Sequence, residues 1–367
     1  MQKVTLGDVC EILDNQRVPI TASERKSGPY PYYGANGLQD YVDGYIFDDD
    51  LVLLAEDGGN FGSKDKPIAY RVSGKCWVNN HAHVLKPKDN IDVNYLCYSL
   101  MFYNVDGLVN GATRQKLTQK DMRKISIPLP LIEEQKAIAE KLDKVSSLIE
   151  KRKQQLSVLD TLVQSKFVEM FGDLRNNSKQ WSFTPLSMMC DVRDGTHDSP
   201  KYCSEGYPLM TSKNFSNGEV DFTDVNLISQ KDFDLINKRS KVDIGDVIMP
   251  MIGTIGHPVI VNTDKPFAIK NVALIKFNLS KVSNIFIKAI LDSDYFATII
   301  EEKNRGNTQK FIALGDIRNV GIPNVPIDMQ NKFADFVKQT EKTKAKIKQS
   351  LAALELLKKS LMQKYFG

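Results

Sequence analysis

Amide and cationic side chains occur together in the first part of the chain, in a pattern suited to hydrogen bonding with nucleotide bases. Asn79-Asn80-His81 follows two lysines, Lys64 and Lys66. Carboxamides can pair with the edge of adenine, and cations can meet guanine or phosphate. We therefore expect these five residues to contact DNA.

Comparable groups follow in the second part and near the end of each half. The group in the second part comprises Thr196, His197, Lys201, Lys213, Asn214, Lys270 and Asn271. The groups near the ends of the halves are Arg114, Gln115 and Lys116, and then Asn307, Gln309 and Lys310. Because these end groups recur in both halves, phosphate positioning fits them better than base reading. For any one lysine, a solvated surface charge is the simpler interpretation.

The sequence carries no recognisable catalytic motif. It contains no phosphate-binding GxxxxGK[ST] loop, no GxSxG nucleophile elbow and no loop typical of S-adenosylmethionine binding. His81 and His83 alternate on an expected strand and share one face, with Cys76 nearby, but two certain ligands are too few for the usual four of zinc. We expect no catalytic residue and no metal site. A structural role and a DNA-facing role both stay open for the two histidines.

The elements that must position these groups are duplicated. The matching segments are Gly111-Ala-Thr113 and Gly306-Asn-Thr308, Asp121-Met-Arg123 and Asp316-Ile-Arg318, Ile127-Pro128 and Ile322-Pro323, Gln135 and Gln330, and Phe171-Gly172 and Phe366-Gly367. Every pair is 195 positions apart (367 minus 172), without insertion. Such a repeat sets the architecture: two copies of one unit, each a variable globular part followed by a shared helical part.

Four segments follow from this pattern. We expect a globular domain over residues 1–130, a helical segment over 131–172, a second globular domain over 173–325 and a second helical segment over 326–367. The globular parts contain short strand-like runs between dense Gly and Pro turn signals, with one helix in each, over 95–103 and 285–300. The expected fold class is α/β (α+β), with two mixed α/β domains.

The helical segments carry a heptad pattern. In the first, the apolar positions are Ile138, Leu142, Val145, Ile149, Leu156, Leu159 and Val163. In the second, they are Phe333, Val337, Ile347, Leu351 and Leu354. The polar residues Thr340 and Lys344 occupy two further positions and weaken the heptad pattern there. A 4,3 spacing favours a helical partner over a one-sided core helix. We expect the two helices to pair as an antiparallel coiled coil in a pseudo-twofold repeat.

Composition limits the kind of partner. The helical segments hold 7 basic and 7 acidic residues over 131–172, and 9 basic and 4 acidic over 326–367. Removing these from the totals of 49 and 45 leaves 33 basic and 34 acidic residues for the globular parts. Such domains are too neutral to hold DNA by charge alone, so other chains should supply much of the affinity. Five cysteines without CxxC spacing and the absence of a long apolar run favour a reduced, cytoplasmic protein that does not enter the membrane.

The duplicated pattern of Gly-x-Thr, Gln-Lys, Asp-x-Arg, Ile-Pro and Gln, followed by a long helix that ends in Phe-Gly, resembles the specificity (S) subunit of type I restriction–modification enzymes. The resemblance covers the whole chain. Tyr30-Pro-Tyr-Tyr-Gly34, Asn79-Asn-His-Ala-His83 and Asp194-Gly-Thr-His197 are similar to motifs of that family's target recognition domains.

The resemblance implies a non-catalytic subunit with two target recognition domains, each reading one half of a bipartite, asymmetric DNA target. The helices would act as a ruler and as a dock for two methylation subunits, and restriction subunits would join the full complex. S-adenosylmethionine, Mg²⁺ and ATP would be bound by those partners and not by this chain. Two alternatives stay open: a scaffold that pairs protein partners without DNA, and the specificity subunit of a type IIB system.

Overall fold

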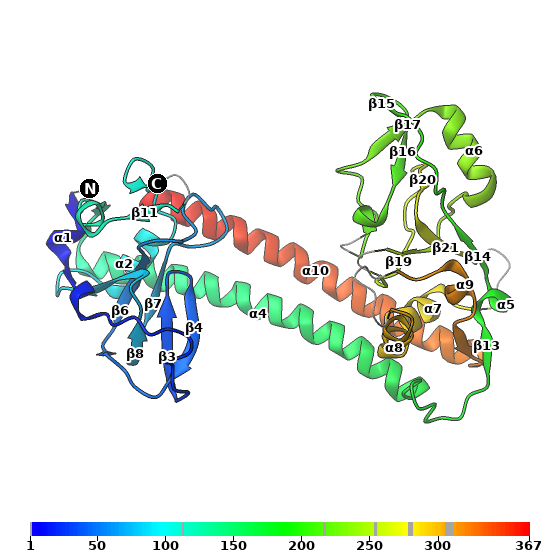
Figure 1. Cartoon of the computed structure of the whole chain (residues 1–367), viewed down its shortest axis with the longest axis horizontal. Coiled ribbons are helices and arrows are strands. Elements are labelled where there is room, and N and C mark those ends of the chain that lie inside the picture. The colour runs from blue at the N-terminus through cyan, green and yellow to red at the C-terminus, as the bar shows by residue number, and fades with distance from the viewer. Residues whose placement is uncertain (1, 112–113, 216–217, 253–254, 278–281, 305–310) are drawn as a thin grey trace. The chain divides into compact units, whose positions relative to one another are not determined.

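The computed structural model describes residues 2–111, 114–215, 218–252, 255–277, 282–304 and 311–367. The chain divides into two compact units: unit 1 is Met1–Lys153 with Gln349–Gly367, and unit 2 is Gln154–Lys348. Each unit contains one globular domain and part of each of two long helices, α4 (Ile132–Phe171) and α10 (Ile327–Phe366) (Figure 1). The segment boundaries expected from the sequence therefore follow the helices, whereas the compact units divide each helix between them.

The domain of unit 1 is built from two four-stranded sheets. The first has the order β2 (Cys10–Ile12), β9 (Ala82–Pro87), β6 (Leu51–Ala55) and β7 (Ala69–Val72). The second has the order β4 (Gly37–Val42), β3 (Tyr30–Gly34), β8 (Lys75–Val78) and β5 (Phe47–Asp48). Two short pairs complete it, β1 (Lys3–Thr5) with β12 (Ser126–Pro128) and β10 (Val109–Asn110) with β11 (Lys116–Leu117). Its helices are α1 (Leu6–Val9), η1 (Asp14–Gln16), α2 (Val93–Met101) and α3 (Gln119–Met122).

The domain of unit 2 repeats the order of the first sheet and of three strands of the second, whose fourth strand joins the opposite edge. Its first sheet has the order β14 (Asp191–Asp194), β21 (Val272–Lys276), β18 (Val247–Pro250) and β19 (Val259–Ile260). Its second has the order β15 (Tyr202–Cys203), β17 (Asn226–Ile228), β16 (Tyr207–Met210) and β20 (Ala268–Ile269), and β13 (Phe183–Pro185) pairs with β22 (Gly321–Pro323). Its helices are α5 (Leu186–Met189), η2 (Ser212–Phe215), α6 (Gln230–Ser240), α7 (Asn284–Leu291), α8 (Asp294–Lys303) and α9 (Leu314–Arg318).

The two helices expected within the globular domains differ in detail from the helices observed. Helix α2 begins at Val93 and not at residue 95, and its N-cap is Asp92, whose carboxylate accepts hydrogen bonds from the N–H groups of Asn94 and Tyr95. The single helix expected over 285–300 is two helices, α7 and α8, because the chain leaves helical geometry at Ser293. The apolar pattern continues across this break, so hydrophobic periodicity alone could not reveal it.

A buried glutamine fixes the start of each long helix on its own domain. Gln135 accepts a hydrogen bond from the N–H of Asp92 and donates to the carbonyls of Asn90 and Pro130. Gln330 accepts from the N–H of Ser283, the N-cap of α7, and donates to the carbonyl of Val325. The repeated glutamine thus connects the long helix with the cap of the helix beside it in each unit.

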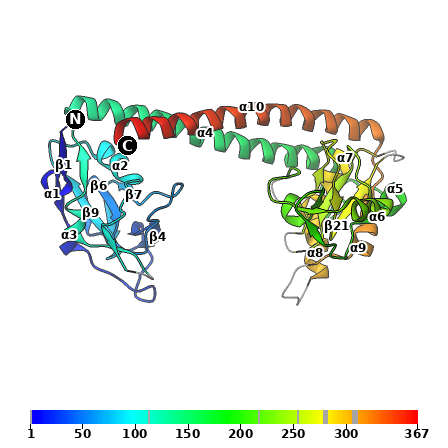
Figure 2. The ribbon, with the colours of Figure 1, turned by 90° about the horizontal axis from the view of Figure 1, so that it is seen from above.

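The long helices run in opposite directions within each unit. In unit 1, Ile138 and Leu142 near the start of α4 share a core with Leu361 and Phe366 at the end of α10 (Figure 2). In unit 2, Phe171 at the end of α4 packs on Phe333 near the start of α10. The predicted antiparallel coiled coil and pseudo-twofold α/β architecture are confirmed.

Burial along both helices follows the heptad pattern. Seven of the predicted pairing residues are half-buried and five are fully buried; the buried ones are Ile138, Leu142, Val145, Ile149 and Phe333. The half-buried ones are Leu156, Leu159, Val163, Val337, Ile347, Leu351 and Leu354. These residues line the faces along which the two helices pack.

The two polar positions in the second helix take part in the packing. Thr340 is buried and donates its hydroxyl hydrogen to the carbonyl of Phe336. Lys344 is 15% exposed, and its Nζ lies 2.7 Å from Asp160 Oδ1 on α4 and 2.7 Å from Glu341 Oε1. Of these two positions, Lys344 therefore joins the helices through an ion pair, whereas the hydroxyl of Thr340 is satisfied within its own helix.

Candidate nucleic-acid interface

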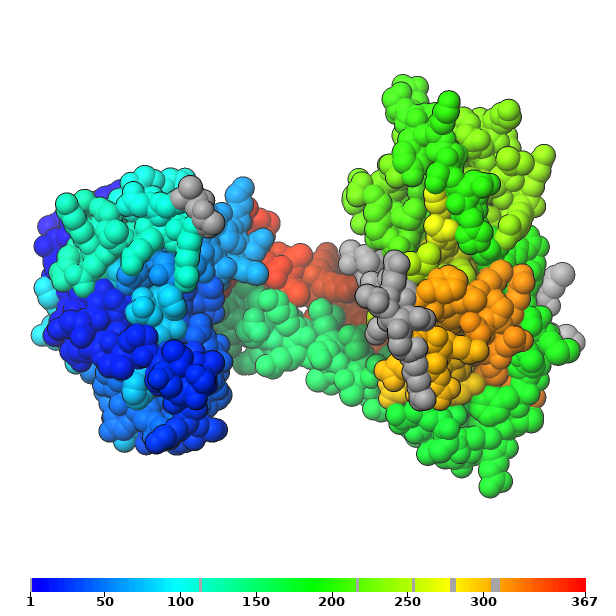
Figure 3. Space-filling model, in the orientation of Figure 1, coloured from blue at the N-terminus to red at the C-terminus, as the bar shows by residue number. Residues whose placement is uncertain are grey.

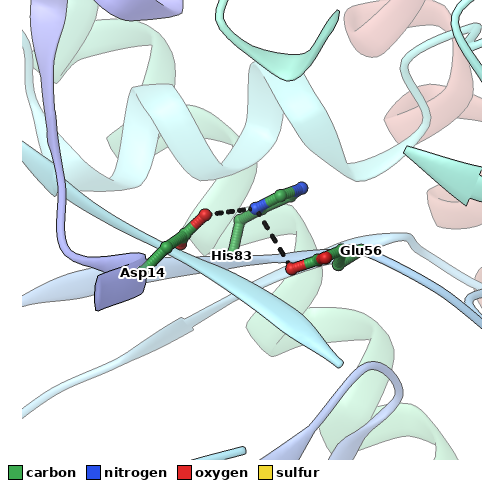
Figure 4. A group of neighbouring side chains, drawn as sticks. All are labelled: Asp14, Glu56 and His83. Atoms are coloured by element: carbon green, nitrogen blue, oxygen red, sulfur yellow. Dashed lines mark hydrogen bonds and ion pairs between the residues drawn. The ribbon is translucent and has the colours of Figure 1, made fainter. Parts of the chain in front are cut away.

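A buried charged cluster lies behind the predicted DNA-binding face of unit 1. His83, on β9, is completely buried, and its Nδ1 lies 2.6 Å from Asp14 Oδ2 and 3.7 Å from Glu56 Oε2 (Figure 4). Arg17 donates from Nη1 to Glu56 Oε2 over 2.7 Å and to the carbonyl of Ala82 over 2.7 Å. The cluster connects β9 with the residues that directly follow β2 and β6.

Both ring nitrogens of His83 have a partner. Its Nε2 faces the carbonyl oxygen of Leu117 at 2.9 Å, and its Nδ1 faces the carboxylate of Asp14. Burial raises the pKa of Asp14, but its hydrogen bonds to His83 and to the Val84 N–H, with the charges of His83 and Arg17, outweigh this and lower it below the ordinary value.

The carboxylates of Asp14 and Glu56 with His83 could in principle hold a metal ion, since their ligand atoms lie within 4.8 Å of one another. The donor set does not fit one. The guanidinium of Arg17 already bonds Glu56 and lies 3.7 Å from Asp14, and both ring nitrogens of His83 are already engaged by Asp14 and the carbonyl of Leu117. We interpret the cluster as an internal ion-pair network.

A second, outer layer reaches the surface. Asp57 Oδ1 lies 2.7 Å from His81 Nδ1 and accepts a hydrogen bond of 2.5 Å from Arg114 Nη2. Lys116 lies beside it, with Nζ 2.9 Å from Glu56 Oε1, and a β-bridge joins Asp57 to Lys116. The structure thus brings His81, Arg114 and Lys116, which were predicted from separate motifs, into one place.

The other predicted residues of unit 1 are divided between interior and surface. Asn79 is buried; its amide donates to Gln39 and accepts from the N–H of His81, so its position favours a structural role. Asn80, Gln115, Lys64 and Lys66 are exposed. The segment after α2, cyan in Figure 3, lies on the surface of unit 1.

In unit 2 the predicted residues around the end of β14 come together. His197 lies between Asp194, with Nε2 2.8 Å from Oδ2, and Asn271, with Nδ1 2.8 Å from Oδ1. Thr196 and Lys270 form a β-bridge, and Lys270 Nζ donates to Ser199 Oγ over 2.6 Å. Asp194 is buried and also bonds Arg239.

The remaining predicted residues of unit 2 lie elsewhere or outside the described residues. Asn214 is buried and its amide bonds the backbone at Thr211, Asp221 and Asp224, which favours a structural role. Lys213 pairs with Asp224, and Lys201 is exposed. Asn307, Gln309 and Lys310 lie outside the described residues.

The two units place different chemistry on the same backbone. The bridge between Asp57 and Lys116 in unit 1 has its counterpart 195 positions later, between Ile252 and Phe311 in unit 2. The hydrogen bond from the N–H of Leu117 to the carbonyl of Glu56 likewise recurs between Ile312 and Met251. A charged cluster in one unit is therefore an apolar one in the other.

Sequence reasoning missed the carboxylates that hold these side chains. Asp14 and Asp194 are 180 positions apart, the offset that Cys10 and Cys190 already show, and each is buried against a histidine. Extending the repeat through this segment would have marked both residues. No local motif marks Asp57, whose role depends on the approach of Arg114 from a distant loop.

Residues 1–159 match the family model described as type I restriction modification DNA specificity domain. The type I restriction enzyme MjaVIII specificity subunit of Methanocaldococcus jannaschii is 23% identical over 98% of this chain and 90% of its own length. The chain is therefore similar to type I restriction–modification specificity subunits, by the family model in its first domain and by this relative over most of its length. The resemblance stated from the sequence is thereby confirmed.

Other relatives match a smaller part of this chain. A Haemophilus influenzae protein named as a type I restriction enzyme specificity subunit is 39% identical over 39% of this chain, a match that spans 37% of its own length. The Escherichia coli EcoBI specificity subunit is 24% identical over 71% of this chain and 62% of its own length.

Solved structures show the same fold. A crystal structure of the type I restriction–modification S subunit from M. genitalium covers 100% of this chain and 96% of its own, with a TM-score of 0.64 at 15% identity. A second, from work on complex assembly and conformational transition of the type I restriction–modification system, has a TM-score of 0.56 at 18% identity. Within the described part of this chain, every helix is too short or too polar for a membrane span.

Proposed function

We propose that this chain is the DNA-reading subunit of a type I restriction–modification complex, and that each globular domain reads one half of a bipartite target. One observation carries the proposal: two domains with the same order in their first sheet each hold a partly exposed histidine against an acidic side chain, with amides and cations around it. Such groups can donate to and accept from base edges.

The target would be asymmetric, because the two sets of side chains differ. Unit 1 presents His81 with Arg114 and Lys116, and unit 2 presents His197 with Asn271 and Lys270. Identical backbones with different donors and acceptors cannot prefer the same bases. Sequence would thus be read separately by each unit.

The chain itself would be non-catalytic. S-adenosylmethionine, Mg²⁺ and ATP would be bound by methylation and restriction subunits, which would also supply cationic contacts to the DNA backbone. The near balance of 33 basic and 34 acidic residues outside the helical segments supports this division of labour. Location with the cellular DNA in the cytoplasm is part of the same proposal.

Exposed apolar residues on the long helices are candidates for docking two methylation subunits. Leu162 on α4 is 45% exposed, and Leu357, 195 positions later on α10, is 46% exposed. Val158 and Leu356 extend the two patches. A patch repeated by the internal duplication suits two copies of one partner.

The helices would also set the number of unread bases between the half-sites. Each runs for 40 residues, about 60 Å at 1.5 Å per residue. Deleting one heptad from each helix, residues 146–152 and 341–347, should shorten the unread gap or abolish binding. An unchanged gap would contradict this ruler role.

The decisive experiment is to co-express the chain with its neighbouring methylation subunit and to map N6-methyladenine across the genome. Two short defined blocks around a fixed gap are the expected result. Methylation without a split motif, or none from a complex shown to assemble, would contradict the proposal and favour a scaffold that binds only proteins.

A further inference from the structure

The guanidinium of Arg114 is exposed and yet held in one place. Its side chain is 60% exposed, while Nη2 donates to Asp57 Oδ1 over 2.5 Å. Asp57 is only 16% exposed. Among the described residues, the ammonium groups of Lys64 and Lys66 have no such partner, so Arg114 differs from these two predicted cations and shares its pairing with a carboxylate only with Lys116.

Three neighbours fix the orientation of this guanidinium. His81 Nδ1 lies 2.7 Å from the same carboxylate oxygen and 3.3 Å from Nη2. Gly58 lies directly under the group: a Cβ on Gly58 would lie 3.2 Å from Nη2 and 3.3 Å from Nε. The φ of Gly58 is +61°, a backbone conformation that favours glycine. The bare glycine backbone thus lets the guanidinium lie close to the chain.

The inner cluster in turn holds Asp57. The residue before it, Glu56, is bonded by Arg17 and by Lys116, and its carbonyl accepts from the N–H of Leu117. His83 then bonds the carbonyl of Leu117. Both segments that carry Asp57 and Arg114 are therefore fastened to buried charges, which keeps the exposed pair in a fixed geometry.

We propose that Arg114 reads a guanine in the half-site bound by unit 1, with Asp57 and His81 as positioning residues. The inference rests on the proposed function and replaces the phosphate role expected for Arg114 from its repeat. An arginine fork pairs bidentately with O6 and N7 of guanine, whereas phosphate contacts carry no sequence information. A fixed fork loses little conformational freedom on binding.

The geometry leaves the fork free for a base. Asp57 accepts one of the two Nη2 hydrogens, and in the described part of the chain no residue is bonded to Nη1 or Nε. With the His81 Nδ1 hydrogen directed at Asp57, the second Nη2 hydrogen stays available beside Nη1 or Nε for a guanine edge. Ile252 stands in unit 2 where Asp57 stands in unit 1, so no carboxylate is present there to hold a cation in this way. The guanine preference should therefore belong to one half-site.

The test compares R114A, R114K and D57N with wild type, each assembled with the methylation subunit, by mapping methylated motifs and by selecting bound sequences from a randomised duplex library. K120A is the control, because it removes an exposed cation of unit 1 that lies outside the predicted DNA-binding residues. Thermal melting of each complex checks that the variants fold.

We expect R114A and R114K to make one guanine position degenerate, with preference for it falling about tenfold to one-hundredfold, and the other block unchanged. D57N should weaken preference at that same position, and K120A should keep the motif. Retention of every base by R114A, or retention by R114K alone, would overturn the inference and restore a phosphate role. If wild type itself selects no split motif, the proposed function fails first.

Discussion

The ring of Phe366, near the end of α10, packs against the ring of Tyr95 on α2, with centroids 5.2 Å apart. The ring of Phe171, at the end of α4, packs in the same way on Phe286 of α7 at 4.9 Å. The repeated Phe-Gly is therefore an anchor for each long helix in the domain of the unit that it enters.

Loss of these anchors should destabilise the units separately. Phe171 is completely buried, so Phe171→Ala should lower the free energy of unfolding of unit 2 by about 3–5 kcal/mol. Phe366→Ala should lower the free energy of unfolding of unit 1 by less, because Phe366 is only half-buried. Urea unfolding followed by tryptophan fluorescence and circular dichroism measures both. Leu356→Ala, at a site 68% exposed, is the control, and an equal loss there would refute the anchor role.

The buried glutamines should matter for stability more than their polar character suggests. Gln135→Ala leaves the N–H of Asp92 and two carbonyls without their partner, for a loss of about 1–3 kcal/mol or more. Gln135→Glu keeps an acceptor but not the donors and should also destabilise. Thermal unfolding checks this; a Glu variant as stable as wild type would show that the two donated bonds contribute nothing.

Two lysines between the long helices should respond oppositely to replacement by methionine. Burial lowers the pKa of Lys344, but its bonds to Asp160 and Glu341 outweigh this and raise it. Burial lowers the pKa of Lys358 with no hydrogen bond to a carboxylate to offset it. Lys358→Met should therefore stabilise unit 1 by about 1 kcal/mol, and Lys344→Met should stabilise unit 2 less or destabilise it.

The pH dependence of these lysines supplies an internal check on the same variants. The raised pKa of Lys344 gives stability that is present below its unfolded pKa and lost as pH rises through the higher folded value. The free-energy cost of burying the charged Lys358 side chain is present at neutral pH. It is relieved as pH rises through the lowered pKa of this lysine. Between pH 8 and 10, wild-type unit 1 should therefore gain stability relative to Lys358→Met. An identical pH profile for the two proteins would count against a buried, charged Lys358.

Low pH should lower the stability of unit 1 through protonation of Asp14. Its folded pKa is below the ordinary 3.8, so its contribution is present above that value and is lost as pH falls through the folded pKa. Asp14→Asn should lower the free energy of unfolding at pH 6 and flatten its fall between pH 5 and pH 3. Urea unfolding across this range measures the slope. An unchanged slope would mean that Asp14 is not the titrating group.

The proposed docking patches give a prediction about assembly. Leu162→Asp and Leu357→Asp each place a charge on an exposed site, so the isolated chain should keep its stability. Each single variant should bind one methylation subunit and the double variant none, as measured by analytical ultracentrifugation of the mixture. Met188→Asp, at another exposed apolar site, is the control. Full assembly by the double variant would place the docking surface elsewhere.

The sequence predicts the architecture well, because repetition and heptad spacing are long-range patterns that many residues carry together. It predicts individual site residues poorly. An amide side chain in a loop can face solvent or bond the backbone, and the sequence does not distinguish the two cases. Asn79 and Asn214 are both buried and bonded internally. Asp57 meets Arg114 because β11 returns to the end of β6, where a β-bridge joins Asp57 to Lys116.

The core of unit 1 also has a consequence for synthesis on the ribosome. Residues that pack on Tyr95 and its neighbours include Leu361 and Phe366, whereas Gln154–Lys348 belong entirely to unit 2. At about 5–20 residues per second, those intervening residues take roughly 10–40 s to make. During that interval the first domain presents an uncovered apolar face, so nascent chains of this protein should depend on chaperones that shield such surfaces.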